Sequence, residues 1–139
     1  MQVNNIAKKA VEIMLSTDSA SANLGITLKS VTSGHAEMSM TIQSNMVNGH
    51  NIAHGGIIFS LADTAFACAC NSYNIVNVAA SCHINFIRPA LLGDKLTAIA
   101  TEQNRGNRIG VYDVKVLNNS GKLIAVFRGQ SMSLDKPIF

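Results

Sequence analysis

A single acidic residue inside an apolar run is the part of the sequence with the clearest chemical potential. Asp63 is the only charged residue between Ile57 and Cys70, and the run follows the tripeptide His54-Gly55-Gly56. A helix that is apolar on every side belongs in the interior of a protein. An unpaired carboxylate there costs several kcal/mol, on the order of the whole stability of a domain, so partners or a function must compensate for it.

The two glycines before this run are suited to binding a carbonyl oxygen. Gly55 and Gly56 at a helix start leave backbone N–H groups and the positive end of the helix dipole open to a ligand. One such donor is typically worth about 3 kcal/mol where negative charge develops in a transition state. The Gly55 N–H is therefore the candidate oxyanion donor, and Asp63 is the candidate nucleophile or general base. Asp63 lies about two turns further along, too far to reach the same carbonyl.

Each of these residues also has a structural interpretation. An acidic residue in an apolar helix can cap a neighbouring segment or pair with a buried arginine. A Gly-Gly pair more often ends a loop or permits tight packing. A single histidine such as His54 is more often structural than catalytic, and Asn48 before Gly49 is typical of a turn.

Other chemistries find less support. His50 and His54 have the spacing of a helical metal pair, but the glycines around them oppose a helix and no third ligand is evident, so no metal is expected. Cys68 and Cys70 lack a second cysteine pair. Ser60 does not lie in a Gly-x-Ser-x-Gly elbow, and no Gly-Lys-Ser or Gly-Lys-Thr phosphate loop is present.

Length and composition indicate one domain, residues 1–139, that associates with other copies. Apolar residues make up 47% of the 139 residues and charged residues 14%, which favours a surface partly covered by another subunit. The net charge of +3 comes without a dense basic cluster, so no nucleic-acid partner is expected. Three cysteines in apolar segments favour reduced thiols and a cytoplasmic protein. No signal peptide or membrane span is expected.

The period of the apolar residues and the turn signals predict an α+β fold. A short helix over about 2–15 precedes a core over about 24–134. In that core, a hairpin of strands 24–32 and 35–42 leads through a polar loop, 43–53, to a helix from His54 to about Asn71. Strands follow at 76–88, 95–103, 109–117 and 122–134, the last three as an antiparallel meander. The economical arrangement is an antiparallel sheet wrapped around one long apolar helix, with edge strands and the far side of the helix covered by a second copy.

The strand over 76–88 has a regular alternation in the sequence. Val78, Ala80, Cys82, Ile84 and Phe86 are expected on one face. The opposite face is expected to carry the polar residues Asn77, Ser81, His83 and Asn85.

Several of these motifs together resemble a known family. The segments Asn48-Gly49-His50 and His54-Gly55-Gly56, then Phe59 to Ala67 and Ala69 to Ser72, resemble the hotdog-fold acyl-CoA thioesterases, and among them the PaaI-type enzymes of phenylacetate degradation. The similarity continues through Phe86, Arg88-Pro89, Gly93-Asp94, Val111 to Asp113 and Phe127 to Gly129. It covers nearly the whole chain beyond the N-terminal helix.

The resemblance implies a hotdog fold and a division of the site between two protomers. In that family the glycine comes from one protomer and the carboxylate from the helix of the other, which overcomes the separation of Gly55 from Asp63. Asn48 and His54 are then expected to support catalysis, and Gly56 and Thr64 to bind substrate. The protein would act as a homodimer and as a dimer of dimers.

The expected reaction is hydrolysis of an acyl-CoA thioester to a free acid and CoA, without a separate cofactor because CoA is part of the substrate. The resemblance favours a phenylacetyl or hydroxyphenylacetyl group, and a medium-chain acyl group is the alternative. The candidates for contacts with the CoA phosphates are Arg88, Arg105, Arg108, Lys122 and Arg128. Two other functions stay open: a hotdog acyl-CoA hydratase or dehydratase, which needs a second acid or base beside Asp63, and a non-catalytic acyl-CoA-binding module.

Overall fold

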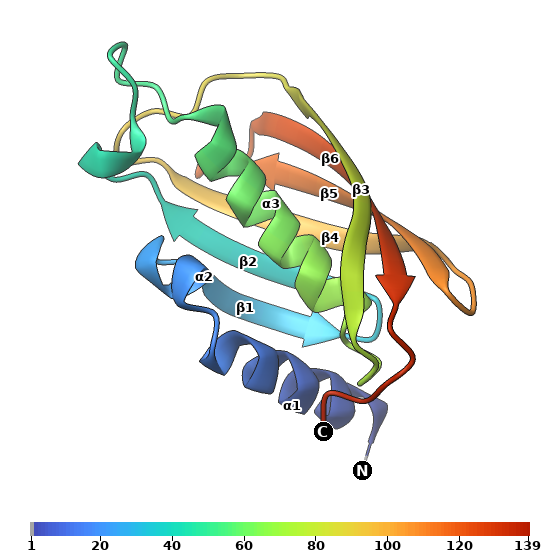
Figure 1. Ribbon diagram of the computed structural model, residues 1–139. Coiled ribbons are helices and arrows are strands. Elements are labelled where there is room, and N and C mark those ends of the chain that lie inside the picture. The colour runs from blue at the N-terminus through green and yellow to red at the C-terminus, as the bar shows by residue number, and fades with distance from the viewer. Residues whose placement is uncertain (1) are drawn as a thin grey trace.

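One long helix lies across the face of a six-stranded antiparallel sheet (Figure 1). The computed structural model describes residues 2–139. The helices are α1 (Val3–Ser16), α2 (Ser19–Asn23), the 3₁₀ turn η1 (Ser44–Met46) and α3 (Gly55–Cys70). The strands are β1 (Thr27–Thr32), β2 (His35–Thr41), β3 (Asn77–Phe86), β4 (Lys95–Arg105), β5 (Ile109–Leu117) and β6 (Leu123–Ser133). Their order in the sheet is β1-β2-β4-β5-β6-β3, and the expected α+β class and β4-β5-β6 meander are confirmed.

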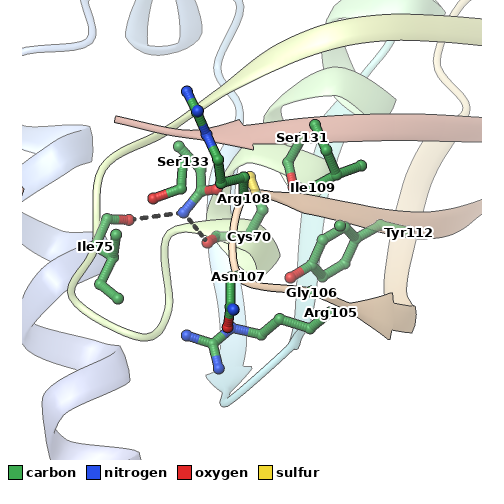
Figure 2. A pocket seen from close by; sticks show the side chains of 12 residues that line it. Cys70, Ile75, Arg105, Gly106, Asn107, Arg108, Ile109, Tyr112, Ser131 and Ser133 are labelled. Carbon is green, nitrogen blue, oxygen red and sulfur yellow. Dashed lines mark hydrogen bonds between the residues drawn. The ribbon is translucent and has the colours of Figure 1, made fainter. Parts of the chain in front are cut away.

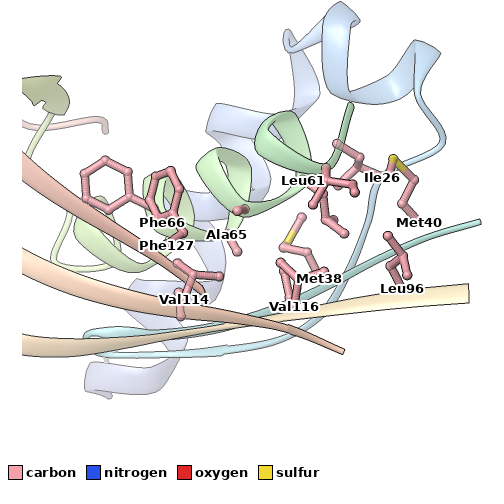
Figure 3. Packing of buried hydrophobic residues seen from close by; sticks show 14 of the residues in the cluster. Ile26, Met38, Met40, Leu61, Ala65, Phe66, Leu96, Val114, Val116 and Phe127 are labelled. Atoms are coloured by element: carbon pink, nitrogen blue, oxygen red, sulfur yellow. The ribbon is translucent and has the colours of Figure 1, made fainter. Parts of the chain in front are cut away.

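The core fills the space between α3 and the sheet (Figure 3). Leu61, Ala65 and Phe66 of α3 are buried against inward-facing residues of the central strands, including Met38, Met40, Leu96, Val114 and Phe127. Phe66 packs in tilted geometry against both Tyr112 and Phe127, with centroid distances of 5.7 and 5.8 Å. Alternate positions along these strands are apolar, so one face of the sheet accepts the helix and the other is left to solvent.

Polar side chains fix the C-terminal end of α3. Ser72 Oγ donates to the carbonyl of Ala69 at 2.7 Å and accepts the Gly34 N–H at 2.8 Å. Asn77 Nδ2 donates to the carbonyls of Cys70 and Ile75 at 3.1 and 3.0 Å, the two dashed bonds in Figure 2. These bonds satisfy carbonyls that a helix end leaves without partners, and they tie α3 to the β1–β2 turn and to β3.

The predicted alternation along β3 is wrong at its N-terminal end. The pairing of β3 with β6 shifts by one residue between Ala79 and Ser81, which is a β-bulge at Ala80. As a result Asn77 reaches α3, whereas Val78 pairs opposite Met132 and is 44% exposed. From Cys82 onward the expected faces hold, because Cys82 and Ile84 pack against the core. A bulge changes the face of a side chain without changing the polarity pattern, so the sequence alone does not reveal it.

Two short helices also differ from the expectation. The helix α2 lies between the predicted N-terminal helix and the first predicted strand, where no element was expected, and the turn η1 lies in the predicted polar loop. The strand β1 begins at Thr27 rather than Leu24. Both short helices have too few residues to display helical periodicity. By contrast β5 has the predicted bounds, and α3 ends one residue before the predicted end. Within residues 2–139, no helix has both the length and the apolar character that crossing a bilayer requires.

We predict that Gly129→Ala destabilises the fold. A Cβ on Gly129 would lie 2.7 Å from the ring of Phe66, so the substitution overpacks the core at a cost of about 1–3 kcal/mol. Gly49→Ala is the matched control, because no heavy atom lies within 4 Å of its added Cβ. Urea denaturation measures both, and equal midpoints for the two variants would contradict the packing described for Phe66.

Candidate active site

The start of α3 presents free backbone donors. The His54 carbonyl accepts the N–H groups of Ile57 and Ile58 at 3.0 and 3.3 Å, whereas those of Gly55 and Gly56 make no hydrogen bond within residues 2–139. Gly56 is exposed, with open space where a Cβ would lie. The helix dipole adds partial positive charge at the same place. The geometry therefore leaves two donors available to a carbonyl oxygen or an anion.

An apolar cavity adjoins these donors. It has a volume of about 350 Å³ and is lined by Ile52, Ala53, Gly55, Ile58 and the segment from Phe86 to Pro89. The Phe86 ring lies directly against Gly55, since a Cβ added to Gly55 would be 2.9 Å from it. Phe86 is nevertheless 51% exposed, so the ring forms part of an open wall. Sequence reasoning did not single out Phe86 as a site residue, because its contact with Gly55 depends on the tertiary path of β3.

Only one of the five basic candidates for phosphate contacts lines this cavity. Arg88 does so, and its Nη1 donates to the Leu123 carbonyl at 3.0 Å. Arg105 stacks over the Tyr73 ring at 3.7 Å, and Arg128 forms an ion pair with Asp113 at 2.7 Å. Arg108 lies in the β4–β5 hairpin beside the small cavity drawn in Figure 2. Lys122 comes just before β6 and is exposed.

Asp63 is half-buried, and its carboxylate has no hydrogen-bond or ion-pair partner within residues 2–139. The ion pairs of that region are Lys8 with Glu12 and Arg128 with Asp113. Burial raises the pKa of Asp63 above the ordinary carboxyl value, and the negative charge of Asp18 raises it further. Neither structural interpretation of Asp63, a cap or a pair with a buried arginine, is found in the part of the chain that the structure describes.

The side of α3 that carries Asp63 faces away from the core. Partly exposed residues recur along this stripe and are mostly small: Gly56, Ser60, Asp63 and Ala67. Asp63 follows Gly55 by eight residues, which at ~1.5 Å of rise per residue is about 12 Å along the helix. One protomer therefore does not bring Asp63 to its own Gly55.

The structure gives Asn48 a role in the loop before α3. Its Oδ1 accepts the N–H groups of His50 and Ile52 at 2.9 and 3.3 Å, so its carbonyl holds the turn. Its Nδ2 makes no hydrogen bond within residues 2–139. His54 is exposed, and its side chain does not cap α3.

Thr64 lies on the side of α3 that faces α2. Its hydroxyl donates to the Ser60 carbonyl at 2.7 Å and lies 3.2 Å from the hydroxyl of Ser21. Ser21 in turn contacts Asp18, a residue for which the sequence offered no signal of proximity to Asp63. The Thr64 hydroxyl thus points into the α2–α3 contact.

The thiols are consistent with core packing. Cys68 and Cys70 are buried, and burial raises the pKa of each to about 12. Thiols in that state are poor nucleophiles. Within residues 2–139, no group of three histidine, cysteine or acidic side chains gathers in a way that could hold a metal ion.

Comparison with known proteins identifies the family. Residues 50–125, more than half of the chain, match the family model described as the thioesterase superfamily. The chain is 47% identical over 118 residues to the acyl-coenzyme A thioesterase PaaI of Escherichia coli, covering 85% of this chain and 84% of that protein.

Similar solved structures support the same family assignment. The E. coli PaaI protein from the phenylacetic acid degradation operon superimposes with a TM-score of 0.96 at 41% identity, covering 98% of this chain and 99% of that one. A Streptococcus mutans protein bound to acetyl CoA superimposes with a TM-score of 0.78 at 25% identity, covering 81% of this chain and 90% of that one. The expected hotdog fold is confirmed, and the chain belongs to the thioesterase superfamily.

Proposed function

We propose that this protein hydrolyses acyl-CoA thioesters at sites shared between two protomers. The Gly55 N–H of one protomer would polarise the thioester carbonyl, and Asp63 of the other would attack it or activate water. The observation that carries the proposal is a half-buried Asp63 without a partner, in a thioesterase-superfamily chain whose helix start offers free N–H donors. The name of the E. coli relative supports CoA as the thiol.

Two surfaces support the shared site. The stripe of α3 around Asp63 carries small residues, which allow another backbone to approach closely. The strand β3 is ten residues long and forms one edge of the sheet, with Val78 and Phe86 largely exposed. Long unpaired edges of this kind are normally covered. A second copy that covers β3 and the stripe would bring each Asp63 towards the other protomer's Gly55, and two such dimers would form the tetramer.

The chemistry follows from these groups. Attack on the thioester carbon, by water that has lost a proton to Asp63 or by the carboxylate itself, places negative charge on the carbonyl oxygen. The Gly55 N–H stabilises that charge. The C–S bond then breaks, CoA leaves as the thiol after taking up a proton, and the acid is released. In the nucleophilic route, water must also hydrolyse the anhydride formed with Asp63.

The cavity beside Gly55 favours an apolar acyl group. Ile52, Ile58 and Phe86 supply apolar walls suited to a phenylacetyl, hydroxyphenylacetyl or medium-chain acyl group. Arg88 at the same cavity is the basic residue best placed to meet a CoA phosphate.

His54 and Gly56 flank the Gly55 donor and would contact the substrate. Thr64 would contribute to substrate binding indirectly, because its hydroxyl lies in the α2–α3 contact beside Asp63. Buried reduced thiols suit a cytoplasmic enzyme.

We predict that Asp63→Asn abolishes turnover while substrate binding persists. The amide removes the base or nucleophile but keeps the shape of the side chain, so kcat falls by about 10²- to 10⁴-fold. A panel of acyl-CoAs is followed by thiol release, enoyl absorbance and equilibrium binding. Thiol release that survives in Asp63→Asn would contradict the assignment. A change in enoyl absorbance would indicate a hydratase, and binding without turnover by the wild type would indicate a binding module.

We predict that Asn48→Asp and Asn48→Ala separate the loop role of Asn48 from a catalytic one. Aspartate keeps the acceptor for His50 and Ile52 but lacks the amide donor, so it should retain Tm and lose about tenfold in kcat/KM, the loss expected for one hydrogen bond. Asn48→Ala, which lacks both the acceptor and the donor, should lower Tm and kcat/KM together. Wild-type kinetics in Asn48→Asp would restrict Asn48 to the loop.

We predict that Asp63→Asn is more stable than the wild type at pH 7. Because burial raises the folded-state pKa of Asp63, the folded protein binds this proton more tightly than the unfolded chain does. The resulting penalty is absent at pH values below the ordinary carboxyl pKa and grows as pH rises through the raised pKa. Thermal denaturation should give a Tm a few degrees higher for the variant at pH 7 and equal values near pH 3. A lower Tm at pH 7 would mean that Asp63 is stabilised by contacts in the assembly.

A further inference from the structure

A second carboxylate is held beside the α3 turn that carries Asp63. Asp18, in the connection between α1 and α2, caps α2 by accepting the Ser21 N–H at 2.9 Å. It also accepts the Ser21 hydroxyl at 2.6 Å. Ser21 is buried, and its Oγ lies 3.2 Å from Oγ1 of Thr64, the residue that follows Asp63. The Ser21 hydroxyl donates its proton to Asp18 and the Thr64 hydroxyl donates its proton to the Ser60 carbonyl, so the contact between these two hydroxyl oxygens places the Asp18 carboxylate close to the α3 turn that carries Asp63.

The charge of Asp18 reaches two groups on α3. It raises the pKa of Asp63, one residue before Thr64, and that of Cys68, four residues after it. The other titratable groups that face Asp63 are the neutral thiols of Cys82, on β3, and Cys70, in α3 itself. Within residues 2–139 no lysine, arginine or histidine forms an ion pair with either carboxylate. Among residues 2–139, therefore, no ion pair neutralises the charge of Asp18 or of Asp63.

We propose that Asp18 is a positioning residue for the reaction: through the contact of Ser21 with Thr64 it braces the α3 turn that carries Asp63, and its charge raises the pH at which activity is lost in acid. This inference rests on the proposed thioesterase function. A general base works best when its pKa approaches the working pH, and a nearby negative charge moves a carboxyl pKa in that direction. The hydrogen bonds from Ser21 offset the repulsion by holding Asp18 in a useful N-cap.

Asp18→Asn tests the charge while keeping the cap, because asparagine caps helices about as well as aspartate. Removing the charge should move the acidic limb of the pH profile of kcat/KM to lower pH by about half a unit, the size expected for two carboxylates on neighbouring elements. Asp18→Ser, also a good N-cap without charge, should shift the limb equally and provides a second neutral variant should the first fold poorly. The plateau of kcat/KM should fall modestly in both, since Asp63 becomes a weaker base.

Glu12→Gln is the matched control. It removes a negative charge from an exposed position on α1 and should leave the acidic limb in place. Unchanged limbs in both Asp18 variants, or an equal shift in Glu12→Gln, would overturn the proposal. If the wild type hydrolyses no acyl-CoA, the thioesterase function itself fails. If the wild type is active and Asp63→Asn is not, the thioesterase function stands, and the Asp18 variants then test only the role of Asp18.

Discussion

The arrangement of this protein depends on an ionisable carboxylate in an otherwise apolar helix. The sheet buries the sides of α3 that pack on it, and most inward positions of its central strands are apolar, with Glu102 of β4 accepting hydrogen bonds from the hydroxyls of Tyr73 and Tyr112. The remaining side of α3 carries Asp63 among small residues and is only partly covered by the rest of residues 2–139. The penalty of half-burying Asp63 is the kind of local cost that proteins accept at functional sites.

Much of this organisation could be predicted from the sequence, because it rests on periodicity and turn chemistry. The bounds of β5, the extent of α3 and the order of the meander follow from alternating residues, an apolar run and Asn-Gly-rich turns. The bulge at Ala80 could not be predicted, since it depends on how β3 pairs with β6 rather than on the residues of β3. The helix α2 was missed because one Asp18 cap and five residues leave no periodic signal.

The site was predictable to a similar extent. The spacing of Gly55 and Asp63 indicated donors and an acid that one chain cannot bring together, and neither group has a partner among the described residues, 2–139. The loop role of Asn48 was the default expectation for a residue before glycine, and its hydrogen bonds agree with that expectation. Phe86 approaches Gly55, and Asp18 approaches α3, although these segments are distant in the sequence. Composition and residue spacing do not reveal such tertiary contacts.

The most direct test of the shared site mixes two inactive variants. Gly55→Pro removes the donor N–H at the first position of α3, where the extended backbone of His54 suits a following proline; the half-exposed Phe86 ring, 2.9 Å from an added Cβ, must move to make room for it. Asp63→Asn removes the acid. If each site takes its donor and its acid from different protomers, re-associated mixtures should recover about a quarter of wild-type thiol release, because half of the dimers then hold one intact site of two. Recovery no greater than the activity of the separate variants would contradict the account.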